Sequence, residues 1–339
     1  MQIKKKKSEK VVQSFRDDIL LDNTKENINH VDVEFKNFVD FLREKNLSDL
    51  QYIIKHNFEY ISKYDKANYI RITDYYNQAK LWGTINLENE DYELINNNAE
   101  ALVEHLQDIE WLYSRLGDYR SKKILLAILN YWLKLDYKRI SQIQDKNYAQ
   151  YFDLDLVSCN KDEVFVDIGG FIGDTLISYS NAFGKENYKN LYCYEIVPTN
   201  IEYIKANVDR FKLENVIVRE KGVSDKKGVL YLSDDELSSI SQLHEEGKIE
   251  VETVTIDEDI KGRVSFIKMD IEGAEEKALI GCRKKIEEYH PKLSLSVYHN
   301  NNHLWKLARI IDEIDPDYKF YLRYYGGVML PTEYLLYAI

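Results

Sequence analysis

Cysteine, proline and, in its first half, glycine are scarce in this chain of 339 residues. Cys159, Cys193 and Cys282 are odd in number and widely spaced, which argues against a disulfide framework and against a cysteine-rich zinc site. No apolar run approaches the roughly 20 residues needed to cross a bilayer, and the N-terminus lacks the apolar segment of a signal peptide. We therefore expect a cytoplasmic protein with reduced thiols and no membrane span.

Positive charge is also in short supply. The chain has 46 Lys and Arg against 58 Asp and Glu, a formal net charge of −12, which repels nucleic-acid backbones and anionic lipids. A basic cluster at 4–7 lies in a polar stretch, 1–30, that we expect to be a flexible tail. No nucleic-acid partner is predicted.

Glycine and proline divide the chain unevenly. Only Gly83 and Gly117 of the 14 glycines precede Gly169, and all four prolines lie between Pro198 and Pro331. Before this change, apolar residues recur at helical spacing, which predicts an all-α domain over 31–147. Within it the string KKILLAILNYWLKL, residues 122–135, is apolar on most sides, so we expect its helix to be buried. Predicted N-caps are Ser48 and Ser121.

Short β-rich runs alternate with helical patterns from Val164 onward, which predicts a doubly wound, Rossmann-like α/β sheet in a domain over 148–339. Two final runs, after Pro316, predict an antiparallel C-terminal hairpin. The polar stretch 233–247 is expected to be a surface excursion. Strands are predicted at VFVDI, LYCYEI, VIVREK, VSFIKMD and KLSLSVY, with helices starting near Thr175, Thr199, Ala274 and His303.

A glycine-rich turn follows the first of these strands, in EVFVDIGGFIGDTL, residues 163–176. Such a turn lets the backbone approach a ligand closely, at the strand end where open sheets bind ligands. Gly169, Gly173 and the acidic Glu195, 22 positions later, imitate a dinucleotide-binding fingerprint. Asp174 directly after the glycines opposes that interpretation, because a carboxylate beside a diphosphate is electrostatically unfavourable.

S-adenosylmethionine has the opposite charge and fits these residues better. Its sulfonium and ammonium groups complement carboxylates near the turn, and Glu195 is placed to accept hydrogen bonds from both ribose hydroxyls. Taken singly, each acidic residue also has a simpler interpretation, as a turn cap or a solvated strand end. The predicted cofactor-binding residues are Asp167, Gly169, Gly170, Gly173, Asp174, Thr175, Glu195, Ile196, Val223, Ser224 and Asp270.

With FIKMDIEGAEEKAL, residues 266–279, the chain resembles the FkbM-type S-adenosylmethionine-dependent methyltransferases. The glycine turn, LSLSVYH ending at His299 and the C-terminal RYYGG and TEYLLYAI support the resemblance, which covers 151–339. It implies a class I methyltransferase fold, a seven-stranded sheet whose last strand is antiparallel, and methyl transfer to a hydroxyl oxygen of a sugar. One departure is Phe171, where methyltransferases of this fold often carry glycine.

The residues expected to do the chemistry are His299, Asp270 and Glu272, which follow neighbouring strands near the acceptor. His299 is the preferred general base because imidazole titrates near neutral pH. The alternative is a histidine bonded to the asparagine-rich loop 300–302. His299 and His303 have the spacing of a helical metal pair, but without a third ligand no metal site is predicted.

The sequence thus predicts an O-methyltransferase that uses S-adenosylmethionine to modify a sugar or glycoconjugate, for example a precursor of a polysaccharide. Two alternatives stay open: an NAD-dependent oxidoreductase, and a non-catalytic cofactor-binding partner of a glycosyltransferase. The helical domain is expected to contribute to the acceptor cleft, or to bind a second copy or a glycosyltransferase. The acceptor itself is a small molecule or glycan whose identity the residues do not reveal.

Overall fold

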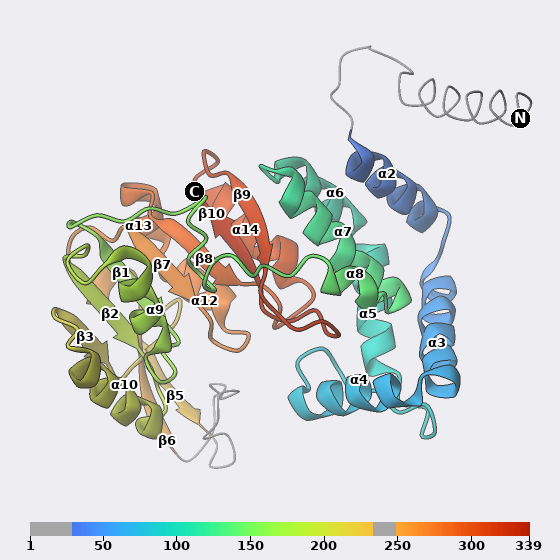
Figure 1. The fold of residues 1–339 in the computed structure, drawn as a ribbon, viewed down its shortest axis with the longest axis horizontal. Coiled ribbons are helices and arrows are strands. Elements are labelled where there is room, and N and C mark those ends of the chain that lie inside the picture. Colours follow the sequence, from blue (N-terminus) through green and yellow to red (C-terminus); the bar gives the residue numbers. More distant parts are fainter. Residues whose placement is uncertain (1–28, 233–248) are drawn as a thin grey trace, which may run out of the picture.

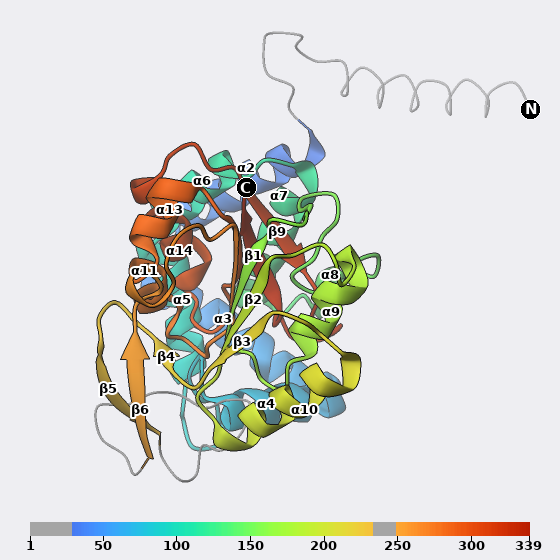
Figure 2. The ribbon, with the colours of Figure 1, turned by 90° about the vertical axis from the view of Figure 1, so that its left-hand side faces the viewer.

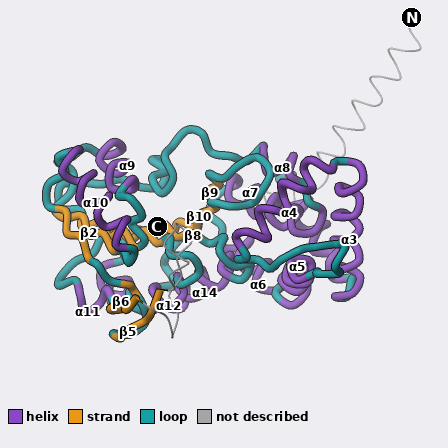
Figure 3. The backbone as a smooth tube through the Cα atoms, turned by 90° about the horizontal axis from the view of Figure 1, so that it is seen from below, coloured by secondary structure: helices purple, strands orange, loops and turns teal. Residues whose placement is uncertain are grey.

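The computed structural model describes residues 29–232 and 249–339. The expected tail, apart from residues 29 and 30, and the expected surface excursion lie outside these described residues. The N-terminal helices lie at one end of the long axis of the molecule, and the sheet with its covering helices lies at the other (Figures 1 and 3). In the described ranges no helix is both long and apolar enough to cross a membrane.

The first part of the chain is helical, as predicted. Asn29 and Asn46 cap α2 and α3 through capping boxes, so the predicted cap at Ser48 is wrong by two residues. Asp118, not Ser121, caps α7, because the Ser121 hydroxyl accepts a hydrogen bond from the Leu322 backbone N–H at 2.8 Å. The helices are α2 (His30–Arg43), α3 (Leu47–Tyr64), α4 (Lys66–Ala79), α5 (Glu93–Glu104), α6 (Leu106–Arg115), α7 (Tyr119–Lys134) and α8 (Tyr137–Ser141).

The second part is built on a seven-stranded sheet with the order β3-β2-β1-β7-β8-β10-β9. The strands β3, β2, β1, β7 and β8 run parallel, whereas β10 is antiparallel to both of its neighbours, so the predicted C-terminal hairpin is confirmed. These strands are β1 (Val164–Ile168), β2 (Asn190–Tyr194), β3 (Val216–Arg219), β7 (Phe266–Met269), β8 (Lys292–Ser296), β9 (Phe320–Tyr324) and β10 (Tyr334–Ala338).

Helices cover both faces of this sheet, with α9 and α10 on one face and α13 and α14 on the other (Figure 2). Alternating side chains of the central strand explain the two layers: Phe165 packs in the cluster with α9 and α10, and Val166 in the cluster with α12 to α14. The helices are α9 (Asp174–Phe183), α10 (Pro198–Phe211), α11 (Ile256–Asp259), α12 (Glu275–Ile280), α13 (Arg283–Tyr289) and α14 (His303–Ile314).

A second, three-stranded sheet was not predicted from the sequence. It consists of β4 (Gly222–Val223), β6 (Ile249–Val254) and β5 (Gly228–Leu232), with β6 between the other two. A small apolar cluster joins Leu232 of β5 and Val251 of β6 to Val197, which precedes α10. β4 has only two residues, too few to show the alternation by which strands are recognised, whereas β6, with six residues, has an alternating pattern that the prediction missed.

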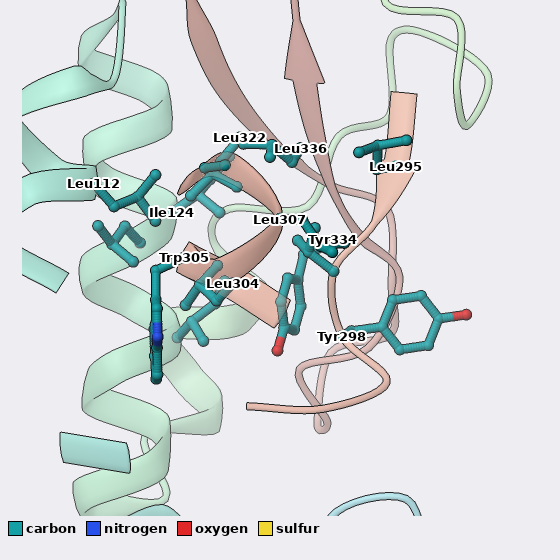
Figure 4. Packing of buried hydrophobic residues seen from close by; sticks show 14 of the residues in the cluster. Leu112, Ile124, Leu295, Tyr298, Leu304, Trp305, Leu307, Leu322, Tyr334 and Leu336 are labelled. Carbon is teal, nitrogen blue, oxygen red and sulfur yellow. The ribbon is translucent and has the colours of Figure 1, made fainter. Parts of the chain in front are cut away.

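The helical part and the sheet share one hydrophobic core. Every residue from Ile124 to Leu133 on α7 is buried, as predicted for this apolar helix. Figure 4 shows Leu112 and Ile124 of the helical part near Trp305 of α14 and Leu322 of β9, and all four belong to one cluster of buried residues. Polar contacts cross the same boundary, since Arg323 Nη2 of β9 lies 2.9 Å from Asp118 Oδ2. The two parts therefore stabilise each other.

Replacing Ile124 with Ala tests this shared core. Ile124 is 1 % exposed, so we expect Ile124→Ala to lower the free energy of unfolding by about 2–5 kcal/mol and to move one cooperative urea transition, monitored by circular dichroism and tryptophan fluorescence. Tyr52→Ala on α3 is the control, because Tyr52 is 71 % exposed and its loss should change the free energy by no more than about 0.5 kcal/mol. Two separate transitions, with only the helical one shifted, would contradict a common core.

Candidate active site

A cavity of about 570 Å³ lies at the carboxyl ends of the parallel strands of the main sheet. The size is typical of a small-molecule site. Residues after β1, β2, β7 and β8 form most of its wall, and Tyr75 and Gln78 of α4 with the following Leu81 form another part. The helical part thus reaches into the same cavity as the sheet.

Close packing explains the glycines of the turn after β1. A Cβ atom on Gly169, whose φ is +84°, would lie 1.8 Å from the Asp270 carbonyl oxygen, and one on Gly170 would lie 2.2 Å from Cys193 Sγ. Gly169 lines the cavity, whereas Gly170 and Gly173 do not. Two of the three predicted glycines therefore shape the turn against neighbouring elements instead of bordering the cavity themselves.

Phe171, the residue that departs from the usual glycine, projects from this turn. It has a left-handed backbone with φ of 46°, is 41 % exposed and lines the cavity. The large side chain therefore lies at the exposed part of the cavity wall and is not packed against the strand ends.

Asp167, predicted as a direct cofactor ligand, lies beneath the turn and does not line the cavity. Its carboxylate is fully buried, and Oδ1 lies 2.8 Å from Nζ of Lys268 on the adjacent β7. Burial raises the pKa of Asp167 to about 6, although the Lys268 ammonium lowers it. Lys268 also donates to the Gly169 carbonyl oxygen, so the ion pair supports the turn from below.

Glu195 follows the end of β2, as predicted, and it lines the cavity. Its Oε1 accepts hydrogen bonds from the backbone N–H groups of Ile196 at 2.7 Å and Val197 at 2.9 Å. These bonds hold the carboxylate in one orientation, and burial raises its pKa. Of the other predicted cofactor-binding residues, Asp174, Thr175, Ile196, Val223 and Asp270 line the cavity, whereas Ser224 does not.

The three predicted catalytic residues meet where β7 and β8 end, on the other side of β1 from Glu195, and this side of the cavity is called its opposite end. Nε2 of His299 lies 3.3 Å from Asp270 Oδ1 and 3.5 Å from Glu272 Oε2. Asp270 and Glu272 line the cavity, whereas His299 is buried behind them and does not. The two carboxylates, and not His299, therefore border the space where the acceptor was expected, and the catalytic role of His299 stays a prediction.

Glu275 of the DIEGAE turn orients His299. Its Oε1 lies 2.8 Å from His299 Nδ1, and its two oxygens also accept from the backbone N–H groups of Ile271 and Gly273. The alternative of a bond to the asparagine loop is not what the structure records. His303 begins α14 and reaches the other oxygen of Glu275 with Nδ1 at 3.3 Å, so it does not join His299 as a helical metal pair.

The charged groups of this cluster shift one another's pKa values. Burial lowers the pKa of His299, but Glu275, Asp270 and Glu272 outweigh it and raise the pKa to about 10. Burial raises the pKa of Glu272 to about 7, with the His299 imidazole acting against it and the nearby carboxylates reinforcing it. Beside these three carboxylates His299 holds a proton at neutral pH, which makes it a poor general base.

Several residues at this end were missed by sequence reasoning. Tyr151 donates to Asp270, and Gln150 Nε2 donates to Glu333 Oε2 at 2.6 Å. Gln150 and Tyr151 lie between the helices and β1, where no periodic pattern distinguishes them. Lys268 could have been found, because it alternates with Asp270 and so projects from the same face of β7.

Backbone strain is concentrated around the cavity. Ten residues other than glycine have positive φ in the described part of the chain, and four of them line the cavity: Tyr151, Phe171, Glu272 and Glu333. Such conformations persist only where the surrounding structure imposes them, and they gather at functional sites. The strain therefore marks the same place as the buried charges.

Comparison with protein-family models matches residues 167–325 to the methyltransferase FkbM domain. This part of the chain is similar to a methyltransferase FkbM domain. The match spans the glycine turn, the DIEGAE segment and the cluster at His299. No curated protein matches the chain significantly.

One solved structure supports the predicted fold. The methyltransferase FkbM from Methylobacillus flagellatus is 25 % identical over 72 % of this chain and 61 % of its own, with a TM-score of 0.63. This chain thus corresponds to about three fifths of that relative's length. An rRNA methylase from Streptococcus thermophilus (12 % identity, 53 % of this chain and 87 % of its own, TM-score 0.35) also matches. Aeropyrum pernix fibrillarin with bound S-adenosylmethionine matches as well, with 9 % identity over 53 % of this chain and 67 % of its own and a TM-score of 0.34.

Lys268→Met tests how the FkbM domain holds its glycine turn. The substitution leaves the Asp167 carboxylate buried without its cation, and we expect it to lower the free energy of unfolding by about 3–5 kcal/mol in urea titrations. The double variant Asp167→Asn with Lys268→Met removes both charges and should recover part of this loss. If the loss of unfolding free energy in the double variant equalled the sum of the losses in Lys268→Met and Asp167→Asn, the buried pair would not be coupled.

Proposed function

We propose that this protein is an S-adenosylmethionine-dependent O-methyltransferase that modifies a hydroxyl group of a sugar or glycoconjugate in the cytoplasm. The observation that carries the proposal is the division of one cavity into two ends. Glu195 stands at one end, held by backbone N–H groups, and Asp270 and Glu272 stand at the other. The FkbM domain match supports methyl transfer as the reaction.

The residues at the first end fit S-adenosylmethionine. Oε1 of Glu195 is occupied by backbone donors, which leaves Oε2 to accept hydrogen bonds from ribose hydroxyls. Gly169 brings the backbone of the turn to the cavity wall. Any side chain there would collide with the Asp270 carbonyl oxygen. Asp174 supplies negative charge at the start of α9, which favours a cationic ligand over a diphosphate.

The second end supports a hydroxylated acceptor. Its wall combines carboxylates with tyrosines and an amide, namely Asp270, Glu272, Glu333, Tyr75, Tyr298 and Gln78. Aromatic faces next to hydrogen-bonding groups suit a sugar ring, which has both apolar C–H faces and polar hydroxyls. Because two of these residues come from α4, we infer that a helical domain, 31–147, forms the acceptor side of a methyltransferase domain, 148–339.

The bound cofactor supplies a methyl group on a positively charged sulfur, to which an acceptor oxygen can form a bond as the carbon–sulfur bond breaks. The protein's task is to align the hydroxyl and receive its proton. The carboxylates at the second end border the space for the hydroxyl and accept the proton. Glu275 holds His299 beside Asp270 and Glu272, so these side chains keep their arrangement before the acceptor binds.

Isothermal titration with S-adenosylmethionine tests the cofactor. We expect saturable binding by the unmodified protein and none of NADH, and a loss of about 10-fold to 100-fold in affinity for Glu195→Gln, because an ionised hydrogen-bond acceptor becomes neutral. Glu333→Gln removes a carboxylate from the other end of the same cavity and serves as the matched control, with affinity unchanged. Binding of NADH in place of S-adenosylmethionine would favour an oxidoreductase.

Mass spectrometry of cellular glycans and sugar nucleotides tests the acceptor. Cells with the gene should contain a methylated species that cells without the gene lack, and Asp270→Asn should abolish it because it alters the end of the cavity where the hydroxyl docks. If cells carrying Asp270→Asn kept their phenotype and no methyl difference appeared, the protein would be a binding partner and not an enzyme. A second copy or a glycosyltransferase bound through the helical domain would then deserve a direct search by cross-linking.

The wall from α4 offers a separate test. Tyr75→Ala and Gln78→Ala should lower product formation at least about 10-fold while leaving the affinity for S-adenosylmethionine within about twofold, since both residues lie on the proposed acceptor side. Tyr60→Ala on α3 is the control, because Tyr60 is 58 % exposed. Equal effects on cofactor and product would place α4 at the cofactor instead.

A further inference from the structure

Three side chains at the acceptor end of the cavity have the spacing of metal ligands. One oxygen each of Asp270 and Glu272 and one nitrogen of His299 all lie within 4.8 Å of one another. Nε2 of His299 is 3.3 Å from Asp270 Oδ1 and 3.5 Å from Glu272 Oε2. Adjacent ligands bound at about 2.1 Å to one octahedral ion stand about 3 Å apart, so a small inward movement would bring these atoms onto one ion.

The buried histidine gives an observation independent of the acidic pair. The side chain of His299 is fully buried, and its Nε2 has no hydrogen-bond partner in the described structure; Asp270 Oδ1 has none either. Nδ1 is engaged by Glu275, 2.8 Å away, so Nε2 is aimed at the two carboxylates. A carboxylate behind a histidine is the usual arrangement in metal sites, where it fixes the ring and makes the ligating nitrogen more basic.

Glu275 is itself held firmly. It is fully buried, and its oxygens accept from the backbone N–H groups of Ile271 at 2.9 Å and Gly273 at 3.1 Å. Glu272 lies between these two residues with φ of 54°, a strained conformation that carries its carboxylate to the cavity wall. The DIEGAE turn thus presents two of the three ligands, Asp270 and Glu272, and orients the third, His299.

The charge at this end is unbalanced. Asp270, Glu272 and Glu333 line it, and the cationic residues among the described lining are Lys268 and Lys221. Lys268 is bound to Asp167 and Gly169, and Lys221 lies near Glu252 and Asp259 in the region of the small sheet. A further cation at His299 would compensate the three carboxylates, and Nε2 can carry either a proton or a metal ion.

We propose that Asp270, Glu272 and His299 bind one divalent metal ion, such as Mn²⁺, that accepts mixed oxygen and nitrogen ligands. Its remaining positions face the cavity. Given the proposed function, the acceptor hydroxyl binds there, is acidified by the ion and passes its proton to Glu333, which lines the cavity outside the trio. The oxygen then forms its bond to the methyl carbon as the carbon–sulfur bond breaks, and the neutral thioether leaves.

Titration of the full chain with Mn²⁺, followed by electron paramagnetic resonance, tests the site. We expect one saturable ion per chain, and spin-echo modulation from a ¹⁴N nucleus that identifies an imidazole ligand. Asp270→Asn and Glu272→Gln should each weaken binding at least about 10-fold. Glu275→Gln, which alters the support of His299 and of the turn that carries Glu272, should weaken binding by about 10-fold to 100-fold. Asp174→Asn is the matched control, because it removes a carboxylate from the other end of the same cavity and should leave Mn²⁺ binding unchanged.

The nitrogen signal is read on the unmodified protein, so the proposal remains testable if a variant fails to fold. Absence of saturable binding would overturn it and leave a proton as the cation on His299. Binding without ¹⁴N modulation that persists in Asp270→Asn would also overturn it, as adventitious binding elsewhere. Titration with S-adenosylmethionine separates this result from the proposed function: cofactor binding without Mn²⁺ binding defeats the metal site alone, and Mn²⁺ binding without cofactor binding defeats the methyltransferase proposal alone.

Discussion

A buried ion pair between Asp167 and Lys268 joins the ends of the two central strands, and the site is built on that junction. Lys268 also donates to the Gly169 carbonyl, so the pair, the glycine turn and the end of β7 form one rigid unit. The turn fits against Asp270 only because Gly169 has no side chain. Both ends of the cavity take their positions from this unit, since Glu195 follows the strand on one side of β1 and Asp270 follows β7 on the other.

The helical part of the chain contributes to the site and to the stability of the sheet. Its central helix, α7, packs against β9, and α4 reaches the cavity through Tyr75 and Gln78. The Trp82 indole N–H donates to the Tyr298 carbonyl oxygen at 2.5 Å, directly before His299. Because one continuous core underlies these contacts, a change in the helical part can alter the geometry of the charged cluster.

Sequence reasoning anticipated the elements that depend on local pattern. The strand at Val164–Ile168 and the helix starting at His303 were predicted at their observed positions, and the buried helix through 122–135 was also correct. The errors arise where a residue has a distant partner. Ser121 has a typical N-cap side chain, yet its hydroxyl binds Leu322, and β4 is too short to show any periodicity.

The sequence by itself determined the succession of the main-sheet strands along the chain, the glycine turn and the convergence of Asp270, Glu272 and His299, because parallel strands bring their carboxyl ends to one edge. Tertiary structure alone decided which of these groups reach the cavity. Asp167 and His299 are hidden because Lys268 and Glu275 engage them, and burial together with those partners sets their charge. Desolvation and pairing depend on neighbours far apart in the chain, so no local pattern could have revealed them.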